Sequence, residues 1–247
     1  MKVKFQILNT NDPREIILRD LTVEPNLEHS IKIPSKNICS FCYSPLKDNS
    51  ECVHHSGLIK FQKVTKIIIG GYYTTNFKGD SLSWWTKRIK KIRDFPFKTT
   101  SLDVELVIAK RIENFGELLE TQVSTAVPTR NLQSLKIFQN LSKKSNIKFI
   151  DPNKMIDILP TYKNGKTRNE YVSQKYKLSQ NCDYYIEKVS KKSKGIVIFD
   201  DILNEGYTLG WIVNLLKDSF SYFYLIVLGR TPWKRFIETY QIPRKCL

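Results

Sequence analysis

From about residue 64 onward, patterns typical of buried strands alternate with helical patterns along the chain. Continuous apolar or β-prone runs, as expected for strands of a parallel sheet, occupy 64–73, 121–128, 196–199 and 222–229. Helical spacing of apolar residues predicts helices at 81–95, 101–120, 132–146, 184–192, 209–217 and 231–240. This alternation predicts an α/β fold with a largely parallel sheet flanked by helices.

The first part of the chain shows a different pattern. Two short apolar-rich runs, 3–8 and 15–23, flank the turn-forming sequence NTNDP and predict a hairpin-like pair of strands. We therefore expect two domains, a small β-rich module over residues 1–62 and an α/β domain over residues 63–247. Within the second domain, the polar and basic stretch 161–181 is expected to begin as a surface loop.

Three of the five cysteines lie close together, at Cys39, Cys42 and Cys52. A C-x2-C pair, nine intervening residues and a C-x2-H ending at His55 supply four sulfur and nitrogen donors, which zinc takes in closed tetrahedral sites. The adjacent His54 is the alternative fourth donor. A disulfide framework is the competing interpretation, and a reducing compartment disfavours it. The pattern predicts a structural zinc site that helps to order the N-terminal module.

Hydropathy and charge restrict the compartment and the partners. No apolar run approaches the roughly 20 residues of a membrane span, and charges interrupt the short apolar pieces at the N-terminus, unlike in a signal peptide. We expect a cytoplasmic protein without membrane attachment. The 40 Lys and Arg residues exceed the 24 Asp and Glu residues, a formal net charge of +16. This charge favours nucleic acid or a polyphosphate metabolite as partner, although a lysine-rich solvated surface gives the same count.

The stretch GIVIFDDILNEGYTLG at 195–210 joins a buried strand to polar residues. Asp200 and Asp201 follow the apolar run, and Gly206 precedes a helix that starts near Thr208. In open α/β sheets ligands bind beyond the carboxyl ends of the strands, and the backbone N–H groups at a helix start bind anions. Carboxylates for hydroxyl groups and a loop for phosphate suit a sugar phosphate. The alternative is an aspartate that merely caps a turn.

The same stretch resembles the ribose-5-phosphate signature of type I phosphoribosyltransferases, in which four hydrophobic residues, two acids and two hydrophobic residues precede a loop with Thr and Gly. The match covers Asp200, Asp201, Gly206 and Thr208. The resemblance implies a type I phosphoribosyltransferase-like domain whose two acids hold the ribose hydroxyls, with or without magnesium. It also implies a loop that wraps the 5′-phosphate, formed by Asn204, Glu205, Gly206, Tyr207 and Thr208.

The order of the motifs is similar to that of the ComF family of competence-associated phosphoribosyltransferase-like proteins. A cysteine module comes first, then VSTAVPTR and KIFQN, and then the acidic stretch, so that the resemblance spans most of residues 36–230. It implies phosphoribosyl diphosphate as the ligand and a diphosphate-binding role for Arg130. It also implies a mobile lid at TYKNGKTRNEY, whose Lys163, Lys166 and Arg168 would stabilise the departing diphosphate.

Two positions depart from the family pattern. His55 stands in place of a cysteine, and it is also a zinc donor. Glu205 stands in place of a phosphate-binding threonine, and its charge beside a dianion would cost about 1–4 kcal/mol in a partly wetted site. Three functions therefore stay open: a phosphoribosyltransferase with an unidentified acceptor, a related ligand sensor or scaffold for a protein or nucleic-acid partner in DNA uptake or processing, and a zinc-containing nucleic-acid-binding protein.

Overall fold

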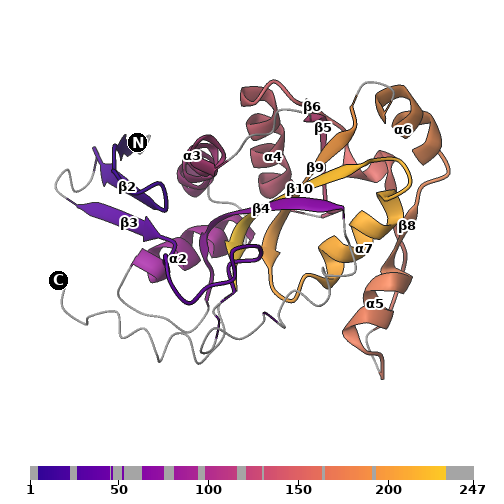
Figure 1. Ribbon diagram of the computed structural model, residues 1–247, viewed down its shortest axis with the longest axis horizontal. Coiled ribbons are helices and arrows are strands. Elements are labelled where there is room, and N and C mark those ends of the chain that lie inside the picture. Colours follow the sequence, from indigo (N-terminus) through magenta and orange to yellow (C-terminus); the bar gives the residue numbers. More distant parts are fainter. Residues whose placement is uncertain are drawn as a thin grey trace.

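The computed structural model describes residues 5–22, 27–44, 46, 52, 63–74, 81–93, 98–115, 121–129, 131–162, 165–190 and 193–231 (Figure 1). The helix that the sequence predicts at 231–240 lies outside these residues, apart from its first position. The other strands and helices predicted after residue 63 are confirmed, with small differences at their ends.

A five-stranded parallel sheet forms the centre of the α/β part. Its strands, in spatial order, are β4 (Val64–Tyr72), β10 (Tyr222–Arg230), β9 (Gly195–Leu203), β5 (Thr121–Ala126) and β6 (Lys148–Phe149). The neighbouring strands pair in parallel throughout. The predicted α/β class is therefore confirmed, and β9, which carries the two adjacent acids, lies in the middle of the sheet.

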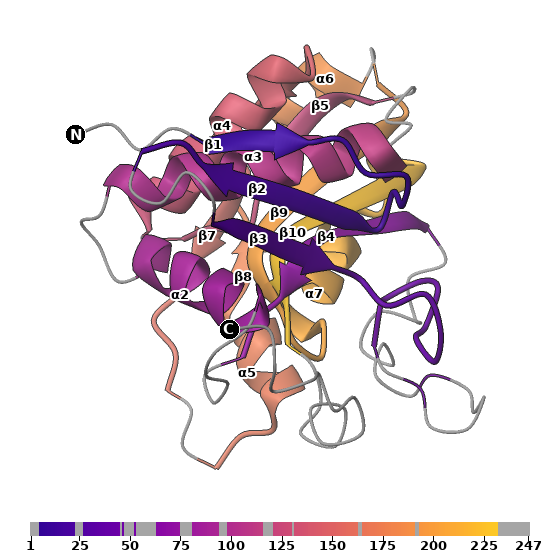
Figure 2. The same ribbon diagram turned by 90° about the vertical axis from the view of Figure 1, so that its left-hand side faces the viewer.

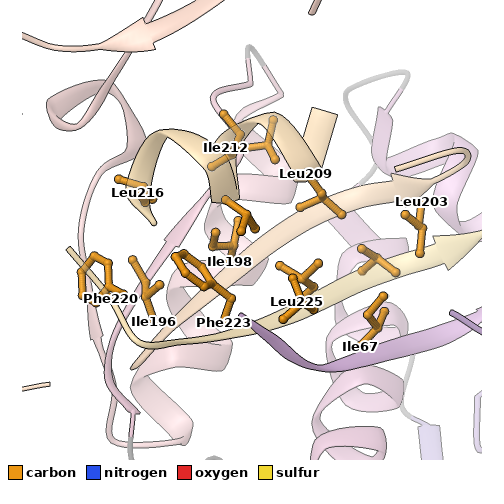
Figure 3. Close-up of a cluster of buried hydrophobic side chains, with 14 of the residues drawn as sticks. Ile67, Ile196, Ile198, Leu203, Leu209, Ile212, Leu216, Phe220, Phe223 and Leu225 are labelled. Carbon is orange, nitrogen blue, oxygen red and sulfur yellow. The ribbon is translucent and has the colours of Figure 1, made fainter. Parts of the chain in front are cut away.

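Helices cover both faces of this sheet (Figure 1). The helices are α2 (Ser81–Arg93), α3 (Lys98–Phe115), α4 (Leu132–Lys144), α5 (Arg168–Lys175), α6 (Cys182–Ser190) and α7 (Tyr207–Leu216). Side chains alternate along a strand, so Val197 and Phe199 of β9 pack with α2, α3 and α4, whereas Ile196 and Ile198 pack on the other face with α5, α6 and α7. Figure 3 shows this second face, where the buried side chains of α7 point onto Ile196 and Ile198.

A separate antiparallel sheet forms the N-terminal module (Figure 2). Its strands, in spatial order, are β1 (Phe5–Leu8), β2 (Glu15–Asp20) and β3 (Glu28–Lys32). The first two strands confirm the predicted hairpin, and the third strand was not predicted. Ile16, Leu18 and Ile31 are buried in the same hydrophobic cluster as α2 and α3. The small sheet is thus fixed to the face of the parallel sheet that carries these helices.

Arg111 of α3 joins the two sheets through backbone carbonyls. Its Nε donates to the carbonyl of Gly70 at 3.2 Å, its Nη2 to that of Ile31 at 2.7 Å and its Nη1 to that of Pro13 at 3.3 Å. Burial lowers the pKa of Arg111 to about 10, so the guanidinium still carries its charge at neutral pH. The three carbonyls replace the water that burial removes from its donors.

The polar stretch 161–181 is more ordered than the surface loop expected at its start. It contains α5 and β8 (Tyr176–Leu178), and β8 pairs antiparallel with β7 (Ile156–Ile158). A capping box starts α5, because the Thr167 hydroxyl accepts from the Glu170 N–H and the Glu170 carboxylate accepts from the Thr167 N–H. The basic residues of this stretch are therefore presented in part by a helix.

Asp103 of α3 is a buried acid beside a cation of α2. Its Oδ2 lies 3.0 Å from Nε of Arg88, whose guanidinium carbon lies 4.8 Å from the ring centre of Trp84. Burial outweighs the attraction of Arg88 and raises the pKa of Asp103 from 3.8 to about 7. Between these values the folded protein holds a proton that the unfolded chain releases. Asp103 therefore lowers stability progressively as the pH rises through this window.

We expect D103N to remove this pH dependence. Between about pH 4 and pH 7 the free energy of unfolding of the wild type should fall relative to that of D103N, by at most about 1.4 kcal/mol per pH unit. Denaturant titrations of both proteins across this window measure the difference. His29, whose pKa is lowered by burial, is present in both proteins, so its own effect cancels. Parallel pH profiles would show that Asp103 titrates normally.

Candidate functional site

The strand order reverses between β5 and β9, which leaves a crevice at the carboxyl ends of these two strands. The chain leaves β5 through α4 and returns in β6 on one side, whereas it leaves β9 through α7 and returns in β10 on the other. Diverging connections of this kind mark the usual ligand position in an open α/β fold. A cavity of about 970 Å³ lies at this point.

Most of the cavity lining comes from the turn after β5, the end of β9 with the loop that follows, and the segment around α5, and Tyr73 after β4 and Thr231 after β10 complete it. The polar and aromatic lining residues include Thr129, Asp200, Asp201, Asn204, Thr208, Lys166, Arg168, Tyr171, Lys175 and Tyr176. Two carboxylates on the sheet side and three cationic side chains on the α5 side thus share one cavity. This pairing suits a ligand that has both hydroxyl groups and anionic groups.

Asp200 and Asp201 occupy the carboxyl-terminal part of β9. Asp200 lies in register with Val227 of β10, and the strand continues past the acids to Leu203. Both residues are half-buried, and the Asp201 N–H donates to Oδ1 of Asp200 at 2.8 Å. This backbone contact orients the Asp200 carboxylate, and carboxylates accept from hydroxyl donors and coordinate divalent cations.

The loop after β9 has the backbone conformation that its glycine suggests. Gly206 is the residue before α7 and adopts φ 83°, a left-handed value that strains other residues. Gly206 at the N-cap position makes no side-chain hydrogen bond to the start of α7. The N–H groups of a first helical turn have no intrahelical acceptor, and Thr208 in this turn lines the cavity. Tyr207 is half-buried and does not line the cavity.

Glu205 does not line the cavity, although it belongs to the same loop. Its Oε2 lies 4.0 Å from Nε of Arg168 at the start of α5, and the two side chains are 50% and 56% exposed. An exposed pair at this distance contributes between about 0 and 1 kcal/mol. The Glu205 side chain thus does not fill the cavity, and its charge partly offsets that of Arg168.

The α5 wall of the cavity combines a cation with aromatic rings. Nζ of Lys175 lies 4.8 Å from the ring centre of Tyr176 and 5.9 Å from that of Tyr171. Burial raises the pKa of Tyr176, and the charge of Asp200 adds to this, so the phenol keeps its proton. Trp211 of α7 holds the backbone here, because its Nε1 donates to the Tyr176 carbonyl at 3.0 Å. The sequence analysis did not identify Tyr171, Lys175, Tyr176 or Trp211 as residues of the site. The T-x-x-E capping box, which marks the start of a helix, was the signal from which α5 could have been predicted.

Cys39, Cys42 and Cys52 come together, and their sulfur atoms all lie within 4.8 Å of one another. The sulfurs of Cys42 and Cys52 are 3.5 Å apart, and none of the three cysteines forms a disulfide within the described residues. Thiolates at about 2.3 Å from a tetrahedral zinc ion lie about 3.8 Å from each other, a similar separation. The three cysteines can therefore hold a metal ion such as zinc.

A tight turn holds the first two cysteines in place. The Cys42 N–H points at the Cys39 sulfur at 3.5 Å, the Tyr43 N–H donates to the Cys39 carbonyl at 2.9 Å, and the Cys39 N–H donates to the Ser44 carbonyl at 2.7 Å. Tyr43 adopts φ 57°, which reverses the chain direction here. N–H groups directed at a sulfur stabilise a thiolate, the form that binds metal.

Four of the residues that the sequence suggests for these sites lie outside the described residues: His54, His55, Arg130 and Lys163. The structure therefore leaves both candidates for a fourth metal donor as predictions. Thr129, directly before Arg130, lines the cavity.

Neither a scan against protein-family models nor a search of the curated proteins gives a match for this chain. In the described segments, every helix is too short or too polar to span a bilayer. What the structure establishes is a parallel α/β sheet with a polar cavity at its switch point, preceded by an antiparallel module with three clustered cysteines.

We expect the protein, purified without added metal, to contain about one metal ion per chain at the cysteine cluster. C39S/C42S should lose this ion because it removes two of the three clustered ligands. Elemental analysis by mass spectrometry measures the content. C182S is the matched control, since Cys182 is a buried thiol outside the cluster whose pKa burial raises to about 11. Equal metal content in C39S/C42S and the wild type would contradict the assignment.

Proposed function

We propose that this protein binds a phosphoribosyl ligand, in particular phosphoribosyl diphosphate, in the cavity between β5 and β9. The observation that carries the proposal is the arrangement of the acid pair and the glycine loop around one cavity at the switch point of a parallel sheet. The resemblance of GIVIFDDILNEGYTLG to the ribose-5-phosphate signature of type I phosphoribosyltransferases supports the same assignment.

Each part of the ligand has a matching part of the cavity. Asp200 and Asp201 would hold the ribose hydroxyls, directly or through magnesium, because carboxylates accept from hydroxyls and coordinate hard cations. The backbone of 204–208 would hold the 5′-phosphate at the start of α7. The diphosphate would meet Lys175 and the turn after β5, where we propose a bidentate contact from Arg130.

The reaction that follows from such a complex is transfer of the phosphoribosyl group. The bond between the anomeric carbon and the diphosphate oxygen breaks, and a bond to the acceptor's nucleophilic atom forms, with diphosphate leaving. The cationic side chains of α5 would stabilise the charge that develops on the departing diphosphate. The acceptor supplies the nucleophile in this scheme, and no side chain of the protein is assigned that part.

A catalytically weak sensor or scaffold is the second candidate function. The contact between Glu205 and Arg168 supports it, because it puts a negative charge beside the phosphate loop and pairs one of the cations that an anionic ligand needs. Such a protein would bind the phosphoribosyl ligand without rapid turnover and report it to a protein or nucleic-acid partner. The two functions share the same binding site and differ in the rate of transfer.

We further propose that the metal of the cysteine cluster is a structural zinc ion, bound by Cys39, Cys42, Cys52 and His55. Three thiolates leave one position of a zinc tetrahedron to fill. His55, three residues after Cys52, is the proposed fourth donor, and His54 is the alternative. Metal analysis of H55A and H54A decides between the two donors. A site with four protein ligands has no open position for substrate, so zinc would order the module and take no part in transfer.

Binding of phosphoribosyl diphosphate is the direct test of the proposed function. Isothermal titration in the presence of magnesium should show about one site per chain, and D200N/D201N should weaken binding by roughly tenfold or more. The matched control is D183N/D218N, which removes two exposed aspartates away from the cavity and should bind like the wild type. Absence of binding to the zinc-loaded wild type would overturn the proposal.

Replacing Glu205 tests whether its charge weakens phosphate binding, as we propose. E205T should tighten binding of ribose-5-phosphate by roughly tenfold, about 1.4 kcal/mol, because it removes a negative charge, frees Arg168 and adds a hydroxyl donor. The gain should be larger at low salt, where charges are less screened. E113T is the matched control, since Glu113 is also an exposed glutamate in an ion pair, with Lys110 at 3.0 Å. Weaker binding of ribose-5-phosphate by E205T than by the wild type would show that the Glu205 side chain itself contributes to ligand binding.

A further inference from the structure

Arg230, the last residue of β10, lies between the cysteine cluster and the loop after β9. Its side chain is buried, with 1% of the residue exposed. On the cysteine side, Nε donates to the Cys42 carbonyl at 3.1 Å and Nη2 donates to the Ser44 hydroxyl. On the cavity side, Nη1 donates to the Leu203 carbonyl at 3.0 Å and to the Asn204 carbonyl. One rigid guanidinium thus joins the metal-binding turn to the first residues of the phosphate loop.

Among the described residues, the hydrogen-bond acceptors of the Arg230 side chain are all uncharged groups. Its acceptors, which also include the Thr231 carbonyl at 3.3 Å, are four carbonyl oxygens and one hydroxyl. None of these groups is charged, and a buried guanidinium is costly without a counter-charge nearby. Three thiolates around a divalent ion leave one net negative charge when the fourth ligand is neutral. A metal-filled cluster would therefore carry a negative charge that balances the Arg230 guanidinium, which already binds Cys42 and Ser44 of the same turn.

We infer that metal in the cysteine cluster tightens the 203–208 loop through Arg230 and thereby raises the affinity of the cavity for its phosphorylated ligand. In this scheme, metal orders the turn over residues 39–44, and the ordered turn fixes the guanidinium of Arg230. The guanidinium in turn fixes the carbonyls of Leu203 and Asn204. Arg230 is a positioning residue in this scheme, since it holds the loop from behind and does not line the cavity. The effect of metal on the loop does not depend on which ligand the cavity binds, whereas the effect on affinity rests on the proposed function.

Hydrogen exchange measures the coupling without any organic ligand. The full chain is stripped of metal and then exchanged with and without added zinc. In the wild type, zinc should slow exchange of the 203–209 amides by roughly fivefold to tenfold. In R230K, which keeps the charge but not the planar fork, zinc should still bind and the loop should no longer respond. S44A, which removes one hydroxyl acceptor on the cysteine side, should give a partial loss and serves as the second variant if R230K fails to fold.

Two controls separate this coupling from general stabilisation. R111K alters the other buried arginine, which joins β4 to the N-terminal sheet, and its loop should still respond to zinc. The amides of α4 should exchange at the same rate with and without zinc in every variant. Equal exchange of 203–209 with and without bound zinc in the wild type would overturn the inference, as would an undiminished zinc response in R230K and S44A.

The same protein samples distinguish failure of the coupling from failure of the proposed function. Titration with phosphoribosyl diphosphate and magnesium should show binding weakened roughly fivefold to tenfold after metal removal in the wild type, and no such difference in R230K. If the loop responds to zinc but neither form binds phosphoribosyl diphosphate, the coupling is supported and the proposed function is wrong. If the ligand binds equally in both forms, the control of affinity by metal is overturned.

Discussion

The burial of β9 on both faces is the constraint on which the rest of the structure depends. Helices cover Ile196 and Ile198 on one face and Val197 and Phe199 on the other, so this strand has no place for a charge until it approaches its carboxyl end. The acid pair falls in that half-buried part of the strand. Chemistry is thereby confined to one edge of the sheet, where the diverging connections have left a cavity.

Attachment of the N-terminal module depends on two buried arginines that bind carbonyl groups. Arg111 links the small sheet to β4, and Arg230 links the cysteine turn to the end of β9. Hydrophobic packing alone would hold these parts without fixing their direction, whereas a guanidinium with several donors fixes distance and angle together. The same chemistry serves two purposes, because Arg111 binds carbonyls of β3 and β4, whereas Arg230 binds carbonyls at the end of β9 and in the loop that follows.

The sequence predicted what depends on local periodicity and missed what depends on packing. Apolar spacing predicted β4, α2, α3, β5, α4, α6, β9, α7 and β10 but not β6, β7, α5 or β8, and the cysteine spacing predicted a cluster that the structure shows. β3 was missed because its pattern is weak, with Ile31 as its only buried position among the five residues of the strand. The cavity wall formed by Tyr171 and Lys175 depends on the antiparallel pairing of β7 with β8, between which α5 lies in the chain, and no short motif encodes this pairing. Arg230 was missed for the same reason, since its partners lie far away in the sequence.

The balance of charges around the cavity limits which ligands it can accept. Two carboxylates exclude a small anion from the sheet side, and three cations on the α5 side favour one, so a single phosphate group would satisfy only half of the cavity. A phosphorylated sugar would suit both halves, because its hydroxyl groups can donate to the carboxylates and its anionic groups can meet the cations. The phosphate end would rely on backbone N–H groups at Gly206 and α7, because Glu205 replaces the hydroxyl donor. Recognition by backbone depends on loop geometry more than on side-chain chemistry, so the proposed phosphate affinity would depend on the contacts of Arg230 with the carbonyls of Leu203 and Asn204.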